Sequence, residues 1–118
     1  MASGRMRRVN EVMREVISGA IATDLQDPRI GFVTVTAVET SPDLRSARVF
    51  VSVLGDEDER EATLAGLRSS HGPLQAAIAA ELRLKRTPTL SFRYDDSVER
   101  GDRITRLLQD EPEADEGR

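Results

Sequence analysis

Several residue types that carry chemistry are absent from this chain or rare in it. It has no cysteine and no tryptophan, and His71 is the single histidine among 118 residues. The lack of cysteine excludes disulfides, thiolate metal sites and thiol catalysis, and it permits a reducing compartment. No segment approaches the roughly 20 consecutive apolar residues of a membrane helix, and residues 1–5 are not followed by an apolar run of signal-peptide length. We therefore expect a soluble, cytoplasmic protein.

Catalytic groups are also few. The sequence contains no glycine-rich phosphate loop with its lysine and no serine in a nucleophile elbow. Asp95 and Asp96 are adjacent, so in a strand they point to opposite faces and do not form a dyad; capping of the following segment is the simpler role for them. One histidine without a thiol is too little for a zinc site. We predict no enzyme, no cofactor and no metal, and a small hydrolytic enzyme that uses His71 stays open as an alternative.

The charge is unevenly distributed. The net charge is −4, but once the five carboxylates and Arg118 of the last nine residues are set aside, 16 basic residues balance 16 acidic ones. Residues 1–109 are long enough to fold as one domain without disulfides. Residues 110–118, with Pro112 and no apolar periodicity, are predicted to be a disordered acidic tail, either solubilising or a regulatory mimic of nucleic acid.

An amphipathic helix is predicted over residues 5–23. Apolar residues recur at helical spacing and define one buried face: Met6, Val9, Met13, Val16, Ile17, Ala20 and Ile21. Arg5, Arg7 and Arg8 lie in its first turns, where positive charge opposes the helix dipole. An anionic partner accounts for this misfit, and a flexible basic arm without a partner is the alternative.

Three strands are predicted, over residues 32–39, 45–54 and 89–94. After the turn Asp27-Pro28-Arg29, the first strand alternates, with Val33, Val35 and Ala37 on one face and Thr34, Thr36 and Val38 on the other. In the second strand Ala47, Val49, Val51 and Val53 share the buried face and leave Arg48, Phe50 and Ser52 opposite. An exposed Phe50 would offer a stacking platform for a base, unless a neighbouring element covers it. In the third strand Leu90, Phe92 and Tyr94 are expected to be buried, with Arg93 on the outer face.

Two helices separated by a break lie between the second and third strands. Asp56 and Glu59 have the spacing of a capping box, which predicts a helix over residues 57–69. Gly72 then favours a left-handed exit, and Pro73 favours the start of a second helix. Backbone donors at Gly72, Leu74 and Gln75 would form an anion site at that start. The second helix is expected to end in Arg83, Lys85 and Arg86, which either compensate the helix dipole or face phosphate.

The expected order of elements is helix, strand, strand, helix, helix, strand, with a last short helix over residues 97–108. One sheet face and every helical stripe must be buried together, so this order predicts an α+β two-layer domain, a three-stranded sheet packed on helices.

Four segments occur in an order that resembles the ribosome-binding factor A family. They are Asp27-Pro28-Arg29-Ile30-Gly31, the hairpin from Val33 through Val51, the break Ser70-His71-Gly72, and Pro88 through Asp95. The resemblance covers about residues 5–108 and implies a type II KH-like fold. Ordinary KH domains clamp nucleic acid with a GXXG loop. The family has a helix–kink–helix there, and Ser70-His71-Gly72 matches it with serine where alanine is commoner, so recognition is expected to rest on RNA shape and phosphates.

The resemblance also implies partners and a role. It predicts binding to the free small (30S) ribosomal subunit and its 16S rRNA, late maturation of that RNA near its 5′ end, and growth in the cold. Ribosome-assembly GTPases are a further class of expected partner, and a monomer is expected. The predicted RNA-binding residues are Ser70, His71, Gly72, Arg83, Lys85, Arg86, Arg5, Arg7, Arg8, Arg48 and Arg93. A generic RNA-binding or protein-interaction module of the same fold remains the main alternative.

Overall fold

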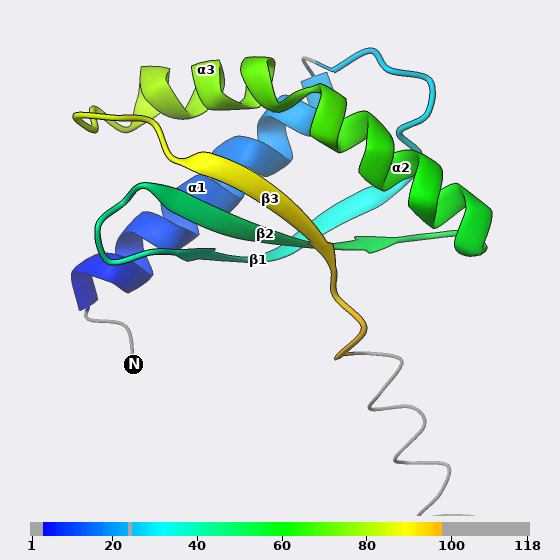
Figure 1. The fold of residues 1–118 in the computed structure, drawn as a ribbon, viewed down its shortest axis with the longest axis horizontal. Helices are drawn as coiled ribbons and strands as arrows, with labels where there is room; N and C mark the ends of the chain where they lie inside the picture. Colours follow the sequence, from blue (N-terminus) through cyan, green and yellow to red (C-terminus); the bar gives the residue numbers. More distant parts are fainter. Residues whose placement is uncertain (1–3, 24, 98–118) are drawn as a thin grey trace, which may run out of the picture.

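The computed structural model describes residues 4–23 and 25–97, and these form three helices and three strands. The helices are α1 (Gly4–Thr23), α2 (Glu57–Ser69) and α3 (His71–Glu81). The strands are β1 (Val33–Thr40), β2 (Ser46–Val53) and β3 (Thr89–Tyr94). The predicted order of these six elements is therefore confirmed (Figure 1). Except for Ser97, the expected helix over residues 97–108 lies outside the described residues, and so does the acidic tail.

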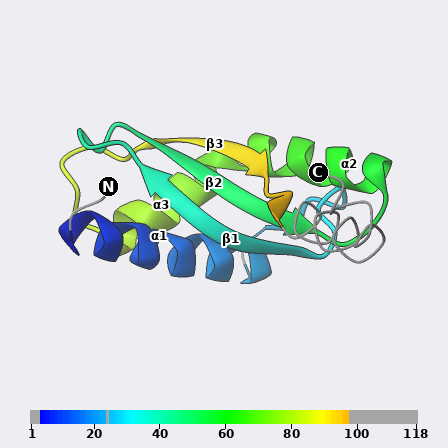
Figure 2. The same ribbon diagram turned by 90° about the horizontal axis from the view of Figure 1, so that it is seen from below.

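The sheet is mixed, with β2 in the centre. β1 and β2 form an antiparallel hairpin, whereas β3 runs parallel to β2 after the crossover through α2 and α3. A parallel neighbour requires such a helical crossover, because a tight turn can join only antiparallel strands. The strands lie in front of α3 when the molecule is seen from below (Figure 2). The predicted α+β, type II KH-like arrangement is confirmed.

The core lies between the sheet and the helices. α1 contributes Met13, Ile17 and Ala20, all at most 4% exposed, and β2 contributes Ala47, Val49, Val51 and Val53. Leu67 of α2, Leu74 and Ile78 of α3 and Phe92 of β3 complete it from the crossover side. The predicted inward faces of α1 and β2 are confirmed. In β3 only Phe92 is fully buried, whereas Leu90 and Tyr94 are half-buried against the core, and Arg93 is exposed as expected.

One strand departs from the simple alternation. The pairing of β1 with β2 shifts between Val35 and Ala37, where Thr36 is the extra residue of a β-bulge. Beyond the bulge the two faces exchange places, so Val38 is 5% exposed and belongs to the core. The prediction that Val38 shares the wetter face with Thr34 was wrong, because one inserted residue inverts every later side chain.

The break between α2 and α3 is tighter than predicted. The capping box of α2 is confirmed, with Glu59 N–H donating to Asp56 Oδ1 and Asp56 N–H to Glu59 Oε1, both at 2.8 Å. Only Ser70 separates the two helices, and α3 already begins at His71. Within the described residues Gly55 is the one glycine with positive φ, so the predicted left-handed exit at Gly72 was wrong.

The turn before β1 is locked onto α2. Asp27 accepts hydrogen bonds from the backbone and side chain of Arg29, and Ile30 N–H donates to the Asp27 carbonyl at 3.0 Å. Gly31 N–H donates to the Thr63 hydroxyl at 3.1 Å. A Cβ on Gly66 would lie 2.7 Å from Ile30 Cγ1, so the turn packs directly on the α2 backbone. The close approach at Gly66 therefore holds the Asp27–Gly31 segment in place. No local sequence pattern predicts this contact.

Candidate nucleic-acid interface

The three predicted cations after α3 lie in a loop. α3 ends at Glu81, and Arg83, Lys85 and Arg86 belong to the connection that leads to β3. Their predicted position in the last helical turn was therefore wrong, and compensation of the helix dipole is not their role. Gln75 Nε2 donates to the Pro88 carbonyl at 2.8 Å and ties the end of this loop back to α3. The three side chains are exposed.

Parallel pairing brings a fourth cation to this loop. Thr89 N–H donates to the Arg45 carbonyl at 2.9 Å, so the start of β3 lies against the start of β2. Arg45, Lys85 and Arg86 consequently line the same open hollow of about 400 Å³, together with Asp43, Leu44 and Leu84. Sequence reasoning missed Arg45 as a site residue, because only the β2–β3 pairing places it beside residues 40 positions further along the chain.

The hairpin turn at this hollow contains a carboxylate and a strained leucine. A hydrogen bond from the Ser41 hydroxyl lowers the pKa of Asp43, and the backbone N–H of Arg45 adds to the effect. Asp43 is thus held ionised within the turn. Leu44 has φ of 61°, a left-handed conformation that costs an ordinary L-residue about 1–2 kcal/mol. The turn therefore presents an apolar side chain among the cations at an energetic cost.

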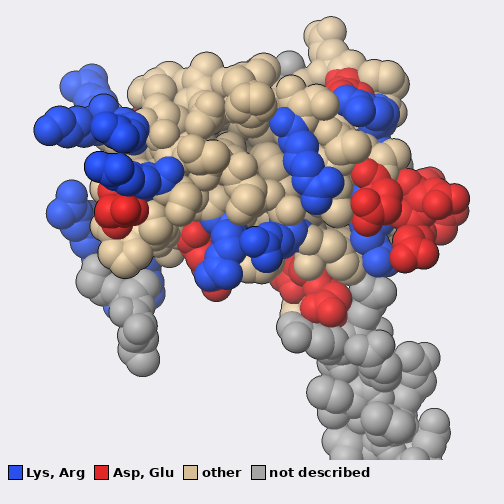
Figure 3. Space-filling model, viewed as in Figure 1, with Lys and Arg blue, Asp and Glu red and all other residues tan. Residues whose placement is uncertain are grey.

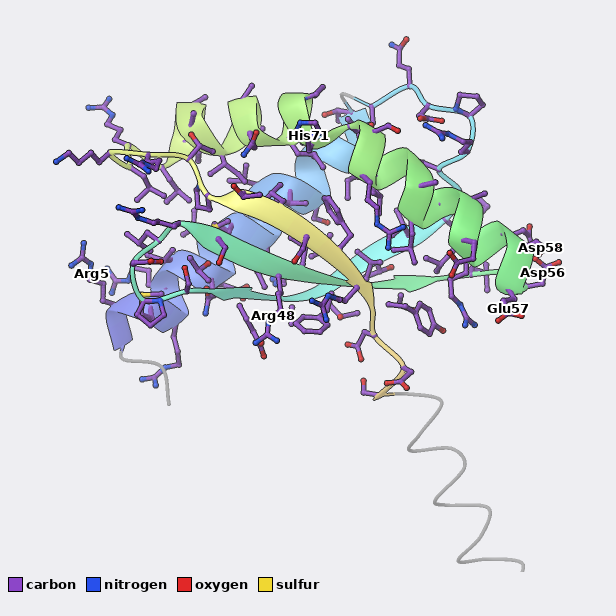
Figure 4. The ribbon with its side chains drawn as sticks, in the orientation of Figure 1. Arg5, Arg48, Asp56, Glu57, Asp58 and His71 are labelled. Atoms are coloured by element: carbon purple, nitrogen blue, oxygen red, sulfur yellow. The ribbon has the colours of Figure 1, made fainter. Side chains whose placement is uncertain are left out.

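The N-terminal turns of α1 lie at the same end of the molecule. Asn10 Oδ1 accepts a hydrogen bond from Thr40 N–H at 3.0 Å, which docks α1 against β1 just before the hairpin turn. Arg5, Arg7 and Arg8 lie within about one and a half helical turns before Asn10, and all three are exposed. Figure 4 places Arg5 at this end, and Figure 3 shows blue side chains gathered there. We call this surface the basic end: Arg5, Arg7, Arg8, Arg45, Arg83, Lys85 and Arg86.

The helix junction is separate from the basic end. α3 has 11 residues, so about 16 Å of helix separates His71 from the loop cations. Leu74 N–H donates to the Ser70 carbonyl at 3.2 Å, which contradicts its predicted role as a donor for an anion. The C-terminal end of α2 also adjoins the start of α3, so the negative pole of one helix offsets the positive pole of the other. The predicted anion site at the junction is not supported by this geometry, and the roles of Ser70, His71 and Gly72 in RNA binding stay predictions.

The outer face of the sheet carries two further predicted residues. Arg48 pairs with Glu39 across the hairpin at 2.8 Å, and both side chains are more than half exposed. Arg93 is exposed and lies opposite Phe50 in the β2–β3 register. Phe50 is half-buried, which favours the alternative that a neighbouring element covers it over an exposed stacking platform. Because Arg48 is already paired, Arg93 is the better phosphate ligand on this face, and both remain predictions.

His71 and Asp95, the side chains considered for catalysis, make hydrogen-bond contacts in separate parts of the fold. His71 is the first residue of α3 rather than a loop residue; it is exposed, and its Nδ1 lies 3.1 Å from the Arg68 carbonyl. Asp95 accepts from the Thr36 hydroxyl at 2.6 Å and from Ser97 N–H at 2.9 Å, the latter being the predicted capping contact. Within residues 4–23 and 25–97 no group of three potential metal-ligating side chains occurs. In the same part of the chain, no helix is both long and apolar enough to cross a membrane.

The fold and the basic end define a class of protein. It is the class of small KH-like α+β domains in which a helix–kink–helix replaces the GXXG loop and cations gather at one end of a mixed sheet. A sequence profile of ribosome-binding factor A matches residues 5–108. The chain belongs to the ribosome-binding factor A family.

Individual relatives agree with this assignment. The chain is 47% identical to ribosome-binding factor A of Halothermothrix orenii, over 98% of this chain and 95% of that protein. It is 51% identical to the Anaeromyxobacter dehalogenans protein of the same name, over 94% and 86%.

Solved structures agree with the fold. A Thermotoga maritima structure described as a putative ribosome-binding factor A has a TM-score of 0.71 and 34% identity, over 79% of this chain and 89% of that one. A Thermus thermophilus ribosome-binding factor A, fitted as a homology model into a cryo-electron microscopy map of its complex with the 30S subunit, has a TM-score of 0.61 and 30% identity, over 74% and 91%.

Proposed function

We propose that this protein binds the free small ribosomal subunit through its basic end and acts, without catalysis, as an assembly factor. The observation that carries the proposal is the convergence of seven cations from three separate segments, α1, the hairpin turn and the loop before β3. Their contacts with phosphate would give affinity and orientation without reading base sequence. Family membership and the Thermus relative fitted into a 30S complex support the small subunit as the target.

The finer role follows from the same resemblance. The protein holds the small-subunit 16S rRNA in an immature conformation during late maturation near its 5′ end, and it supports growth in the cold. It acts in the cytoplasm as a monomer, and an assembly GTPase is a candidate for its release. The absence of a GXXG loop favours recognition of RNA shape and phosphates over a grip on four particular nucleotides.

Sedimentation of the purified protein tests the proposal. It is mixed with free small subunits, with assembled ribosomes and with an unrelated structured RNA, at two salt concentrations. Selective, salt-sensitive migration with free small subunits is expected. Equal binding to every RNA would leave a generic RNA-binding module, and no binding at all would refute the role.

A triple variant, Arg83→Ala/Lys85→Ala/Arg86→Ala, locates the contact. The three side chains are exposed and lie in a loop, so their removal should weaken binding while the thermal unfolding curve stays unchanged. The matched control, Arg83→Lys/Lys85→Arg/Arg86→Lys, keeps the charge and should keep the affinity. Undiminished affinity of the alanine variant would place the site elsewhere on the molecule.

A further inference from the structure

The end of the molecule opposite the basic end carries an exposed apolar pair. Phe32 is 80% exposed and Leu54 is 75% exposed, and they are the large hydrophobic residues that the described part of the chain leaves in solvent. Leu54 N–H donates to the Phe32 carbonyl at 3.0 Å, one step beyond the pair Val33–Val53. Residues opposite each other on antiparallel strands have neighbouring side chains. The two therefore form one patch, which we call the Phe32–Leu54 patch.

The patch stands between shallow hollows. An open hollow of about 360 Å³ between it and α2 is lined by both residues and by Arg29, Glu59, Ala62 and Thr63. The Arg29 guanidinium is paired with Asp27 at 2.7 Å, so its charge is offset within the turn. A second, of about 330 Å³, lies over the strand ends and is lined by both residues with Thr34 and Ser52. A side chain placed in either hollow would contact the Phe32 ring and the Leu54 methyl groups. The shape thus suits an incoming apolar side chain.

Carboxylates follow Leu54 in the chain, and one of them, Glu59, lines the hollow on the α2 side of the patch. From Asp56 to Glu61 the chain carries five carboxylates against Arg60 alone, and all five are exposed. Asp56, Glu57 and Asp58 lie together at this end in Figure 4, and red side chains gather there in Figure 3. Charge at an α2 N-terminus stabilises the helix by itself and needs no partner. The exposed apolar pair beside it has no such explanation.

We propose that the Phe32–Leu54 patch docks a lysine- and arginine-rich protein segment that carries an apolar side chain. Charge complementarity selects this occupant. The screening length is about 8 Å at physiological salt, so the carboxylates of residues 56–61 attract a cationic segment bound at the patch. The same carboxylates repel the phosphates of RNA. The inference rests on the proposed function: the basic end binds RNA of the small subunit while the opposite end binds a basic protein of that particle.

Photo-crosslinking in the free small subunit tests the proposal. The full chain carries benzoylphenylalanine in place of Phe32, or in place of Arg86 as the matched control, and sedimentation is measured on the same samples. After irradiation, the variant at Phe32 should crosslink to protein, within a basic peptide, and the variant at Arg86 should crosslink to RNA. Crosslinks from position 32 to RNA alone, or none while position 86 reacts, would overturn the docking surface.

Two further readouts separate the possible failures. A chain that does not sediment with free small subunits would overturn the proposed function and this inference with it, whereas sedimentation without a protein crosslink at position 32 overturns the inference alone. The double variant Phe32→Ala/Leu54→Ala should weaken binding about tenfold, the cost expected for losing a central apolar contact. Gln26→Ala, an exposed residue that lines neither hollow, should leave the affinity unchanged. Unaltered affinity of the double variant would also refute the proposal.

Discussion

Two helical glycines provide a matched pair of substitutions with opposite expected effects on stability. Gly66 lies within α2 and is buried, whereas Gly72 is the second residue of α3 and is exposed. Replacing glycine by alanine in a helix stabilises it by about 0.5–1 kcal/mol, because alanine has less backbone freedom to lose on folding. Gly72→Ala should show this gain, since no heavy atom lies within 4 Å of the added Cβ.

Gly66→Ala should instead destabilise the protein. The added Cβ would lie 2.7 Å from Ile30 Cγ1 and 3.4 Å from Arg29 Cβ, in a segment that the Asp27–Arg29 contacts hold in place. Overpacking of this kind costs about 1–3 kcal/mol. After the helical gain is subtracted, a net loss of about 1 kcal/mol remains, which lowers the melting temperature by about 4–8 °C in a domain of this size.

Thermal and urea unfolding followed by circular dichroism measure both variants. Gly72→Ala should melt about 2–4 °C above the unsubstituted protein, from a gain near the lower limit of about 0.5 kcal/mol, and should bind free small subunits normally. If Gly66→Ala were as stable as Gly72→Ala, the close approach of the Asp27–Gly31 turn to α2 would be wrong. A loss of stability in Gly72→Ala would instead support a left-handed backbone conformation at Gly72, which the structure does not show.

The remaining predictions concern salt, pH and the docking of α1. With seven phosphate contacts, log affinity for the small subunit should fall with log salt at a slope of about −5 to −6. The triple alanine variant of Arg83, Lys85 and Arg86 should make this slope shallower by about 2 to 3 units. An unchanged slope would contradict the electrostatic account. The Arg29 guanidinium and backbone N–H lower the pKa of Asp27 to about 2, from an ordinary value of 3.8. The ionised carboxylate therefore stabilises the fold above about pH 4, and this contribution is lost as the pH falls towards 2. Asp27→Asn should flatten that part of the pH dependence of the unfolding free energy, and an identical profile would show that Arg29 does not stabilise the ionised Asp27. Asn10→Ala removes the acceptor for Thr40 N–H and should cost about 1 kcal/mol, with faster hydrogen exchange at the Thr40 amide, whereas unchanged protection would mean that α1 docks without this bond.

Features that depend on neighbours in the chain could be predicted from the sequence. The capping box of Asp56 and Glu59, the start and end of α2, and the buried face of β2 all follow from contacts within a few residues or from a period of two. The order of helices and strands also predicted the two-layer architecture, in which helices cover one face of the sheet. The basic character of Arg83, Lys85 and Arg86 was equally visible, although their place in the fold was not.

The tertiary structure decided whatever depends on register and close approach. The bulge at Thr36, which turns Val38 inward, arises from pairing with β2 and has no signal in the alternating residues of β1. Arg45 joins Lys85 and Arg86 only because β3 pairs in parallel with β2, and Gly66 matters only because Ile30 packs against it. A local pattern specifies a residue's face and conformation, but which distant segment meets that face depends on long-range packing, and the positions of both ends of this molecule follow from that packing.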